Sequence, residues 1–173
     1  MPLIRKVVIT GSGGAPYMTR YTLGSTGYRL HVFHRGDIDQ DCHDHPWSFW
    51  TFPLTPYVEE VWHNGHRHRA NVAAGEWHFR PATYTHRVIG PQFEVAHPHT
   101  KLMRDVMVNV CTSRRGFPWY TRLAWWWFGT DKIVTIVKTG PVVRKWGFQR
   151  AVGKAFVWTP WREYLAKVRS WMD

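Results

Sequence analysis

Cysteine is scarce in this sequence: only Cys42 and Cys111 occur in 173 residues. Two cysteines cannot build the dense disulfide framework that stabilises many small secreted domains. The N-terminus also lacks the basic stretch followed by an apolar run that marks a secretory leader. These absences predict a reduced protein of the cytoplasm, without a disulfide scaffold.

Long apolar runs are lacking as well. The cluster Trp125-Trp126-Trp127-Phe128 is followed at once by Gly-Thr-Asp-Lys at 129–132. A membrane-spanning helix needs roughly 20 consecutive apolar residues. We therefore expect a soluble protein with no membrane partner.

Acidic residues are few: 12 Asp and Glu stand against 23 Lys and Arg, which gives a net charge of +11. Such an excess favours an anionic partner, which can be nucleic acid or a small anionic substrate. However, the basic residues are spread from Arg5 to Arg169, and no run of Lys or Arg exceeds two residues. A solvated basic surface is the simpler interpretation, so nucleic acid is not the favoured partner.

Aromatic residues, in contrast, are abundant, at 16% of the chain with 12 tryptophans. Aromatic side chains suit β-strands and can fill the interior of a barrel with few large groups. The hydrophobic fraction of 44% and the length of 173 residues are typical of one globular domain. The composition therefore favours a compact β-barrel.

The strongest functional signal is the run Cys42-His43-Asp44-His45-Pro46-Trp47. Side chains alternate faces in a strand, so His43 and His45 point the same way while Asp44 points the other way. Two imidazoles from one strand can bind a single ion, and His86 on a neighbouring strand would complete the set. Three protein ligands leave coordination positions open for water, dioxygen or a substrate, as catalytic metal sites require.

A second segment strengthens this interpretation. Gly75, Pro81 and His86 stand in order, with five residues between the first two and four between the last two. Together with the His-x-His run, this pattern resembles the two sequence motifs of the cupin superfamily. The resemblance implies an all-β, cupin-type double-stranded β-helix, which is a jelly-roll barrel.

Two positions depart from the cupin pattern. Thr83 replaces the glycine usually found in the second motif, and Phe49 occupies the position of the glutamate ligand. The sequence is thus more similar to three-histidine cupins, such as the thiol dioxygenases, than to cupins with an additional glutamate ligand. The resemblance implies a divalent metal held by His43, His45 and His86, with Fe(II) favoured and Zn, Ni or Mn left open.

A finer resemblance covers most of the chain outside residues 90–130. It links the chain to a group of largely uncharacterised cupin-like proteins of bacteriophage and bacterial genomes. A phage-encoded chain would lie in the host cytoplasm. The segments that carry the resemblance are 17–20, 30–33, 43–47, 57–60, 79–82, 86–88, 139–141, 144–148 and 158–165.

The expected organisation is a barrel domain over residues 1–158 and a helix over 159–173. Thr159-Pro160 is typical of a helix start, and apolar residues recur at helical spacing from Trp161 onward. Residues 90–130 are expected to be an insertion that forms a lid, a subunit contact or a segment packed outside the sheet. Strands are expected at 3–9, 17–23, 28–34, 43–52, 57–62, 132–138 and 142–148.

A substrate pocket is expected beside the metal. Trp47, Phe49 and Thr51 share the inward face of the His-x-His strand, and the two aromatic side chains would exclude water. Arg80 or Arg87 would bind an anionic group of the substrate. Arg87 is the weaker candidate, because it directly follows a metal ligand and should face away.

One of two adjacent glutamates, Glu59 and Glu60, should face the pocket, because successive strand residues point to opposite sides. Either can act as a catalytic general base or as a hydrogen-bond partner of a metal ligand. The alternation cannot be followed across Pro53 and Pro56, so both glutamates stay candidates.

His66 and His68 form a second His-x-His sequence and an alternative metal site. Asn64-Gly65 just before them predicts a tight hairpin turn, which would place both imidazoles beside a solvent-exposed loop. We therefore favour the first pair. His78, His97 and His99 are likewise expected to be surface or core residues.

These features favour a metal-dependent oxidoreductase that acts on a small, anionic molecule by an Fe(II) dioxygenase-like reaction. A metal-dependent sugar isomerase or epimerase is the alternative enzyme, and oxygen consumption separates the two. A cupin that binds a metal or ligand without catalysis is a third interpretation. A homodimer is left open.

Overall fold

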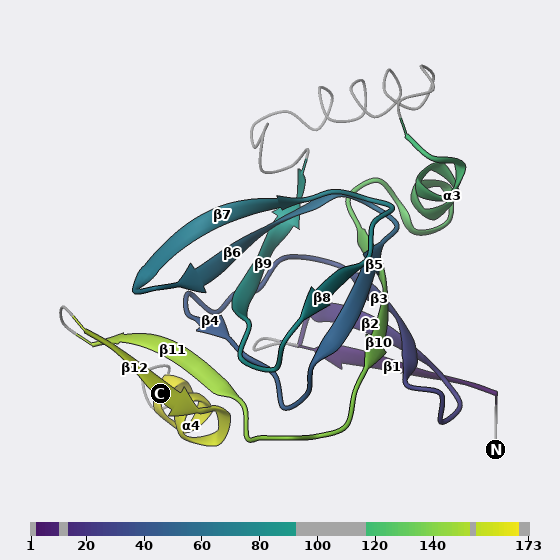
Figure 1. Cartoon of the computed structure of the whole chain (residues 1–173). Coiled ribbons are helices and arrows are strands. Elements are labelled where there is room, and N and C mark those ends of the chain that lie inside the picture. Colours follow the sequence, from purple (N-terminus) through teal and green to yellow (C-terminus); the bar gives the residue numbers. More distant parts are fainter. Residues whose placement is uncertain (1–2, 11–13, 93–116, 153–154, 170–173) are drawn as a thin grey trace.

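The computed structural model describes residues 3–10, 14–92, 117–152 and 155–169. Within them, the strands form two antiparallel sheets of six strands each (Figure 1). In spatial order, the first sheet contains β1 (Ile4–Thr10), β2 (Pro16–Leu23), β3 (Tyr28–Phe33), β10 (Ile133–Thr139), β5 (Phe49–Pro53) and β8 (His78–Arg80). The second contains β12 (Ala155–Pro160), β11 (Gly147–Val152), β4 (Cys42–His43), β9 (Thr85–Pro91), β6 (Tyr57–His63) and β7 (His66–Val72).

The expected all-β class is confirmed: the two sheets form a curled barrel, and the short helix α4 (Trp161–Arg169) follows them. The helix begins at Trp161, because Pro160 still belongs to β12. It is docked on the barrel by two stacked aromatic pairs. Tyr164 lies on Phe148 with ring centroids 3.9 Å apart, and Trp161 lies on Trp146 at 5.6 Å.

A second described helix, α3 (Trp119–Phe128), lies within the segment expected to be an insertion. Its Ala124 packs with Val32 of β3 and Val134 of β10. Both valines alternate with residues that line the interior, so they face outward. α3 therefore covers the outside of the first sheet. The rest of this segment, at 93–116 with His97 and His99, and the chain end at 170–173 lie outside the described residues.

The hairpin between β6 and β7 has the predicted tight turn. Asn64 and Gly65 both have positive φ, at 49° and 82°, as a two-residue turn that matches the twist of the strands requires. The turn places His66 and His68 at the start of β7, where both side chains are exposed.

The strand expected through the His-x-His run is interrupted. β4 ends at His43 in the second sheet, and β5 begins at Phe49 in the first. Between them, the backbone N–H of His45 donates to the carbonyl oxygen of Ala82 at 3.2 Å. Pro46 then has no N–H with which to continue a ladder. The chain therefore turns a corner between the sheets, and the histidine pair lies at that corner.

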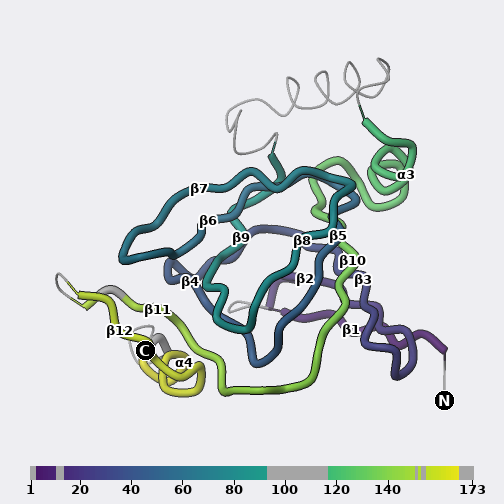
Figure 2. The backbone as a smooth tube through the Cα atoms, viewed as in Figure 1, coloured from purple at the N-terminus to yellow at the C-terminus, as the bar shows by residue number. Residues whose placement is uncertain are grey.

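The strand expected at 142–148 is also wrong. Residues 140–146 instead cross from the first sheet to the second, as the path from β10 to β11 in Figure 2 shows. The backbone N–H of Val143 donates to the carbonyl oxygen of Pro46 at 2.8 Å, so this segment is bound to the corner and not to a ladder. β11 and β12 then form a hairpin that pairs with β4.

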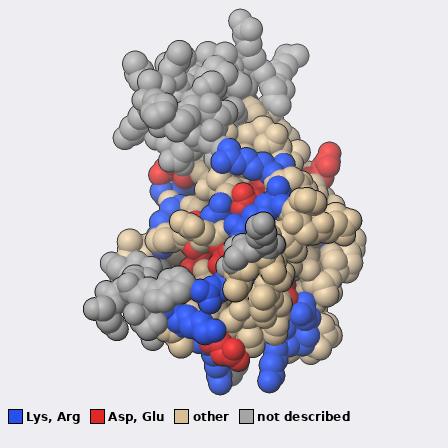
Figure 3. All heavy atoms as spheres, turned by 90° about the vertical axis from the view of Figure 1, so that its left-hand side faces the viewer, with Lys and Arg blue, Asp and Glu red and all other residues tan. Residues whose placement is uncertain are grey.

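None of the described helices is long and apolar enough to span a membrane. On the face shown in Figure 3, Lys and Arg side chains are scattered among uncharged residues, with Asp and Glu between them. This view agrees with the dispersed basic residues of the sequence.

Candidate metal centre

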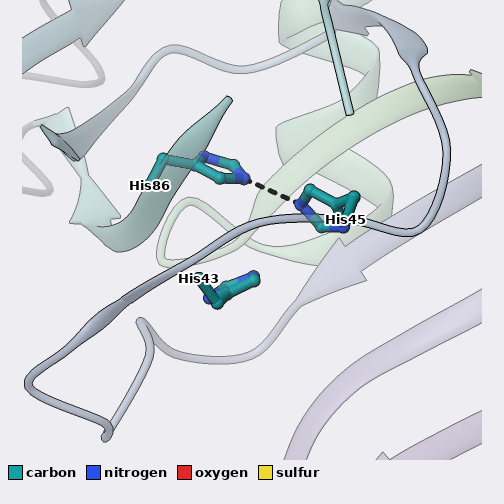
Figure 4. A group of neighbouring side chains, drawn as sticks. All are labelled: His43, His45 and His86. Atoms are coloured by element: carbon teal, nitrogen blue, oxygen red, sulfur yellow. Dashed lines mark hydrogen bonds between the residues drawn. The ribbon is translucent and has the colours of Figure 1, made fainter. Parts of the chain in front are cut away.

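The three predicted ligand histidines lie together where the two sheets meet. His43 on β4 and His86 on β9 are direct cross-strand partners, and His45 follows at the corner. Their ring centroids are separated by 5.1 Å (His43 to His45), 5.4 Å (His43 to His86) and 5.3 Å (His45 to His86). Figure 4 shows the three rings converging on one point from two segments of the chain. The fold thus places His86 beside two histidines that precede it by more than 40 positions in the sequence.

The donor atoms fit one metal ion. One ring nitrogen from each histidine lies within 4.8 Å of the other two. The Nε2 atoms of His45 and His86 are 3.0 Å apart. Two imidazole nitrogens at about 2.1 Å from an ion, at right angles to each other, would be separated by about 3.0 Å. This is the only group of three such donors found among the described residues, and His66 and His68 do not belong to it.

Burial keeps two of these imidazoles in the neutral form that binds metals. It lowers the pKa of His43 to about 4, with the charge of Asp37 opposing and that of His86 reinforcing the effect. Burial, followed by the neighbouring histidines, lowers the pKa of His45 well below its ordinary value. Near neutral pH, a metal would therefore not have to displace protons from these two ligands.

Glu59 fixes the orientation of the third histidine. The Nδ1 atom of His86 donates to Oε2 of Glu59 at 2.8 Å, which leaves the Nε2 atom of His86 facing the other histidines. The second carboxylate oxygen accepts from Tyr84 at 2.6 Å and pairs with Arg80 at 2.9 Å. A carboxylate behind a ligating imidazole fixes its tautomer and raises its basicity.

Glu59 is ionised in this position. Burial alone would raise its pKa, but the hydrogen bond and charge of His86, followed by Arg80 and Tyr84, lower it below the ordinary value. Its side chain is only 1% exposed and is fully engaged by these three partners. The glutamate expected as a general base therefore lies behind His86, with no free oxygen toward the pocket.

Glu60 and Arg87 lie on the opposite face of the second sheet. Arg87 donates to Glu60 through Nε at 2.9 Å, and Arg67 lies 3.7 Å from the same carboxylate. Neither residue lines the cavity that contains the histidines. Of the two glutamates expected from the sequence, only Glu59 contacts a histidine of the cluster.

The histidines open into a cavity of about 460 Å³ between the two sheets. Trp47, Phe49 and Thr51 line it, and the ring of Phe49 lies 4.6 Å from that of His45. Arg80 does not line it, because its guanidinium is held by Glu59 behind the histidines. The expected aromatic wall is thus present, and the expected anion-binding arginine is engaged elsewhere.

Asp44 has a role that the sequence did not reveal. It is 2% exposed, and its carboxylate accepts from the backbone N–H of Gly147 at 2.7 Å and from the indole of Trp158 at 2.9 Å. Arg144 lies 2.8 Å from the same group. Asp44 therefore ties the C-terminal hairpin to the corner that carries the ligand histidines. Trp146, which precedes Gly147 in the sequence, lines the cavity.

Three further polar residues of the cavity were also missed: Arg20, Arg29 and His31. They lie on β2 and β3, and the alternation of those two strands places them on one face. That alternation was a usable signal, but the sequence does not tell which face of this hairpin turns inward.

No family model matches the sequence, and no curated protein matches it either. Hydroxypropylphosphonic acid epoxidase from S. wedmorenis is a distant structural neighbour, with 9% identity and a TM-score of 0.43 over 78% of this chain and 55% of that chain. A cupin domain from Bordetella pertussis Tohama I has 11% identity and a TM-score of 0.36 over 81% and 96% of the two chains. A cupin 2 conserved barrel domain protein from Rhodopseudomonas palustris has 12% identity and a TM-score of 0.40 over 96% and 84%.

This chain spans just over half the length of the epoxidase. At such low scores and identities, these likenesses carry no conclusion about the site. The case for a metal centre rests on the donor geometry and on the carboxylate behind His86.

Proposed function

We propose that this chain is a metal-dependent enzyme that oxidises a small anionic molecule with dioxygen, and that Fe(II) is its metal. The observation that carries the proposal is the cluster of three histidines opening into a cavity with room for a small molecule. Three neutral imidazoles suit iron among other divalent ions. The likeness of the His-x-His and Gly75-to-His86 motifs to three-histidine cupins supports the same choice.

A bound ion of this kind would supply a Lewis-acidic, redox-active centre with coordination positions left for small molecules. The residues of the chain would orient the metal ligands and exclude water. Glu59 would hold His86 in its ligating orientation, since their hydrogen bond is short and buried. Trp47 and Phe49 would exclude water from the reacting groups, because their rings line the cavity next to His45.

The isomerase or epimerase alternative requires a base that faces the substrate. The residues that line the cavity include no Asp or Glu in the part of the chain that the structure describes. Glu59, which was expected as a general base, is engaged by His86, Tyr84 and Arg80. The geometry therefore favours oxidation over proton shuttling by a carboxylate.

The test is oxygen consumption by protein reconstituted anaerobically with Fe(II). We expect one iron per chain and oxygen uptake with a member of a panel of small carboxylates and phosphates. The His43→Ala/His45→Ala variant, treated identically, should show neither. Stoichiometric iron binding without oxygen uptake on the whole panel would support the non-catalytic interpretation instead. Turnover of a sugar without oxygen uptake would support the isomerase.

A further inference from the structure

The cavity wall formed by the first sheet carries two arginines, Arg20 on β2 and Arg29 on β3. Arg20 is the cross-strand partner of His31, and Arg29 lies two positions before His31 on the same strand. Residues in these positions share one face of a sheet. Both arginines therefore project from one wall into the cavity that also contains the ligand histidines.

In contrast to the other arginines around the site, neither of these two pairs with a carboxylate of the described residues. Among the described residues, the only hydrogen bond of the Arg20 guanidinium runs from Nε to Nε2 of His31, at 3.2 Å. The guanidinium of Arg29 lies 5.1 Å from the ring centroid of Trp47 and forms no ion pair within the part of the chain that the structure describes. By contrast, carboxylates lie within 4 Å of the other arginines near the site, in the pairs Arg80 with Glu59, Arg87 with Glu60, Arg67 with Asp41 and Arg144 with Asp44.

Two unpaired guanidinium groups in a partly dehydrated cavity are costly unless an anion compensates them. Burial, and then the charge of Arg29, lowers the pKa of Arg20, which reflects the same cost. No acidic residue lines the cavity to compensate it within the described chain. None of the described residues supplies the missing negative charge, and the cavity size suits a small molecule that brings it.

We propose that Arg20 and Arg29 bind an oxyanion group of the substrate. A carboxylate and a phosphate both carry the negatively charged oxygens that two guanidinium groups can bind. Guanidinium groups match these anions through paired N–H donors. His31 accepts from Nε of Arg20 and Trp47 stacks against Arg29, so both side chains are held in place before the anion arrives.

What we infer about the other end of the substrate rests on the proposed function. A molecule anchored by its oxyanion at the arginines would direct a thiol, hydroxyl or amine at its other end toward the histidines. The substrate class is therefore a small bifunctional molecule with a heteroatom a few carbons from an acid group. Arg20 and Arg29 thereby take the role that the sequence had assigned to Arg80 or Arg87.

The first experiment uses metal-free protein and does not depend on the metal. Inorganic phosphate and acetate are titrated separately by calorimetry into wild type, Arg20→Gln/Arg29→Gln and Arg69→Gln. Arg69 is exposed on β7 and serves as the control for loss of a positive charge. We expect the double variant to bind the preferred anion about tenfold to a hundredfold more weakly, and the control to be unchanged. Equal binding by all three proteins, or no binding of either anion, overturns the proposal.

The second experiment links the arginines to the metal. Co(II)-loaded protein is titrated with 3-mercaptopropionate, 2-mercaptoethylphosphonate and uncharged 3-mercapto-1-propanol, and the cobalt absorption is followed. We expect the better charged thiol to bind at least about tenfold more tightly than the neutral one, and the double variant to lose this preference. Equal affinities in wild type overturn the arginine subsite and leave the metal function intact. A cobalt spectrum that no thiol perturbs contradicts the proposed function, and the first titration then decides the arginine subsite.

Discussion

The carboxylate of Glu59 lies 2.8 Å from Nδ1 of His86, on the side of the imidazole away from the other two histidines. The bond is buried, and Tyr84 and Arg80 hold the glutamate in turn. The orientation of one proposed metal ligand therefore depends on residues that do not themselves belong to the ligand set.

Replacing Glu59 should weaken metal binding without removing a ligand. In Glu59→Gln the imidazole of His86 keeps a neutral acceptor but loses the anion that raises its basicity. We expect the metal affinity to fall about 10- to 100-fold, measured by competition with a chromophoric chelator. Glu60→Gln is the matched control, since Glu60 pairs with Arg87 on the other face. An equal loss in both variants would show that the effect is a general one of charge.

The histidine pair at the corner should be essential for metal binding and dispensable for folding. The His43→Ala/His45→Ala variant should contain no metal by elemental analysis and keep the circular dichroism of the wild type. The His66→Ala/His68→Ala variant should keep its metal, because these side chains are exposed on β7. Retention of metal in the first variant, or its loss in the second, would move the site to the hairpin.

Asp44 should be important for stability. Its removal leaves the indole N–H of Trp158 and the backbone N–H of Gly147 without their acceptor, and Arg144 without its ion partner. We expect Asp44→Ala to lower the free energy of unfolding by about 3 kcal/mol, measured by urea denaturation. Glu76→Ala, at an exposed position, should change it by less than about 0.5 kcal/mol. If the free energy of unfolding of Asp44→Ala changed as little as that of the control, Asp44 would not hold the C-terminal hairpin to the corner.

Metal-free protein should lose stability as the pH falls from 7 to 5. Burial, followed by Arg20 and Arg29, lowers the pKa of His31 to about 3, and burial lowers that of His43 to about 4. The unfolded chain takes up protons at these histidines below about pH 6.5, whereas the folded chain does not. Because the unfolded state then binds more protons, the free energy of unfolding decreases with falling pH.

Each of the two histidines should contribute about 1 to 2 kcal/mol to this loss. Denaturant unfolding at pH 7 and pH 5 gives the size of the effect. The His31→Gln/His43→Gln variant should lose the share of the pH dependence that these two groups supply, whereas His45, whose pKa is also lowered by burial, keeps its own share. An unchanged dependence in that variant would assign the effect to other residues.

The positions of the histidines could be predicted because strand alternation is local. His43, His45 and Trp47 keep a common inward direction even though the strand breaks at the corner. Because the side chains keep alternating between the two faces across the break, Trp47 and Phe49 line the cavity as predicted. The break itself was not predicted, since it depends on hydrogen bonds with distant segments: His45 donates to Ala82, and Val143 donates to Pro46.

The polar partners of the site could not be predicted for a related reason. Glu59 meets Tyr84 and Arg80 only because β6 pairs with β9 and β8 lies nearby, and neither relation has a short-range signal. Likewise, Arg20 and Arg29 face the cavity because β3 pairs with β10, more than 100 residues later. The register between distant strands decides which face of the β2–β3 hairpin is buried.

The central claim is that His43, His45 and His86 bind one exchangeable metal ion. The most direct test is an anomalous diffraction map from crystals of the metal-loaded protein, collected at the absorption edge of the metal. We expect one peak about 2.1 Å from a ring nitrogen of each of the three histidines. A peak at His66 and His68, or metal-loaded crystals with no peak between the three rings, would contradict it.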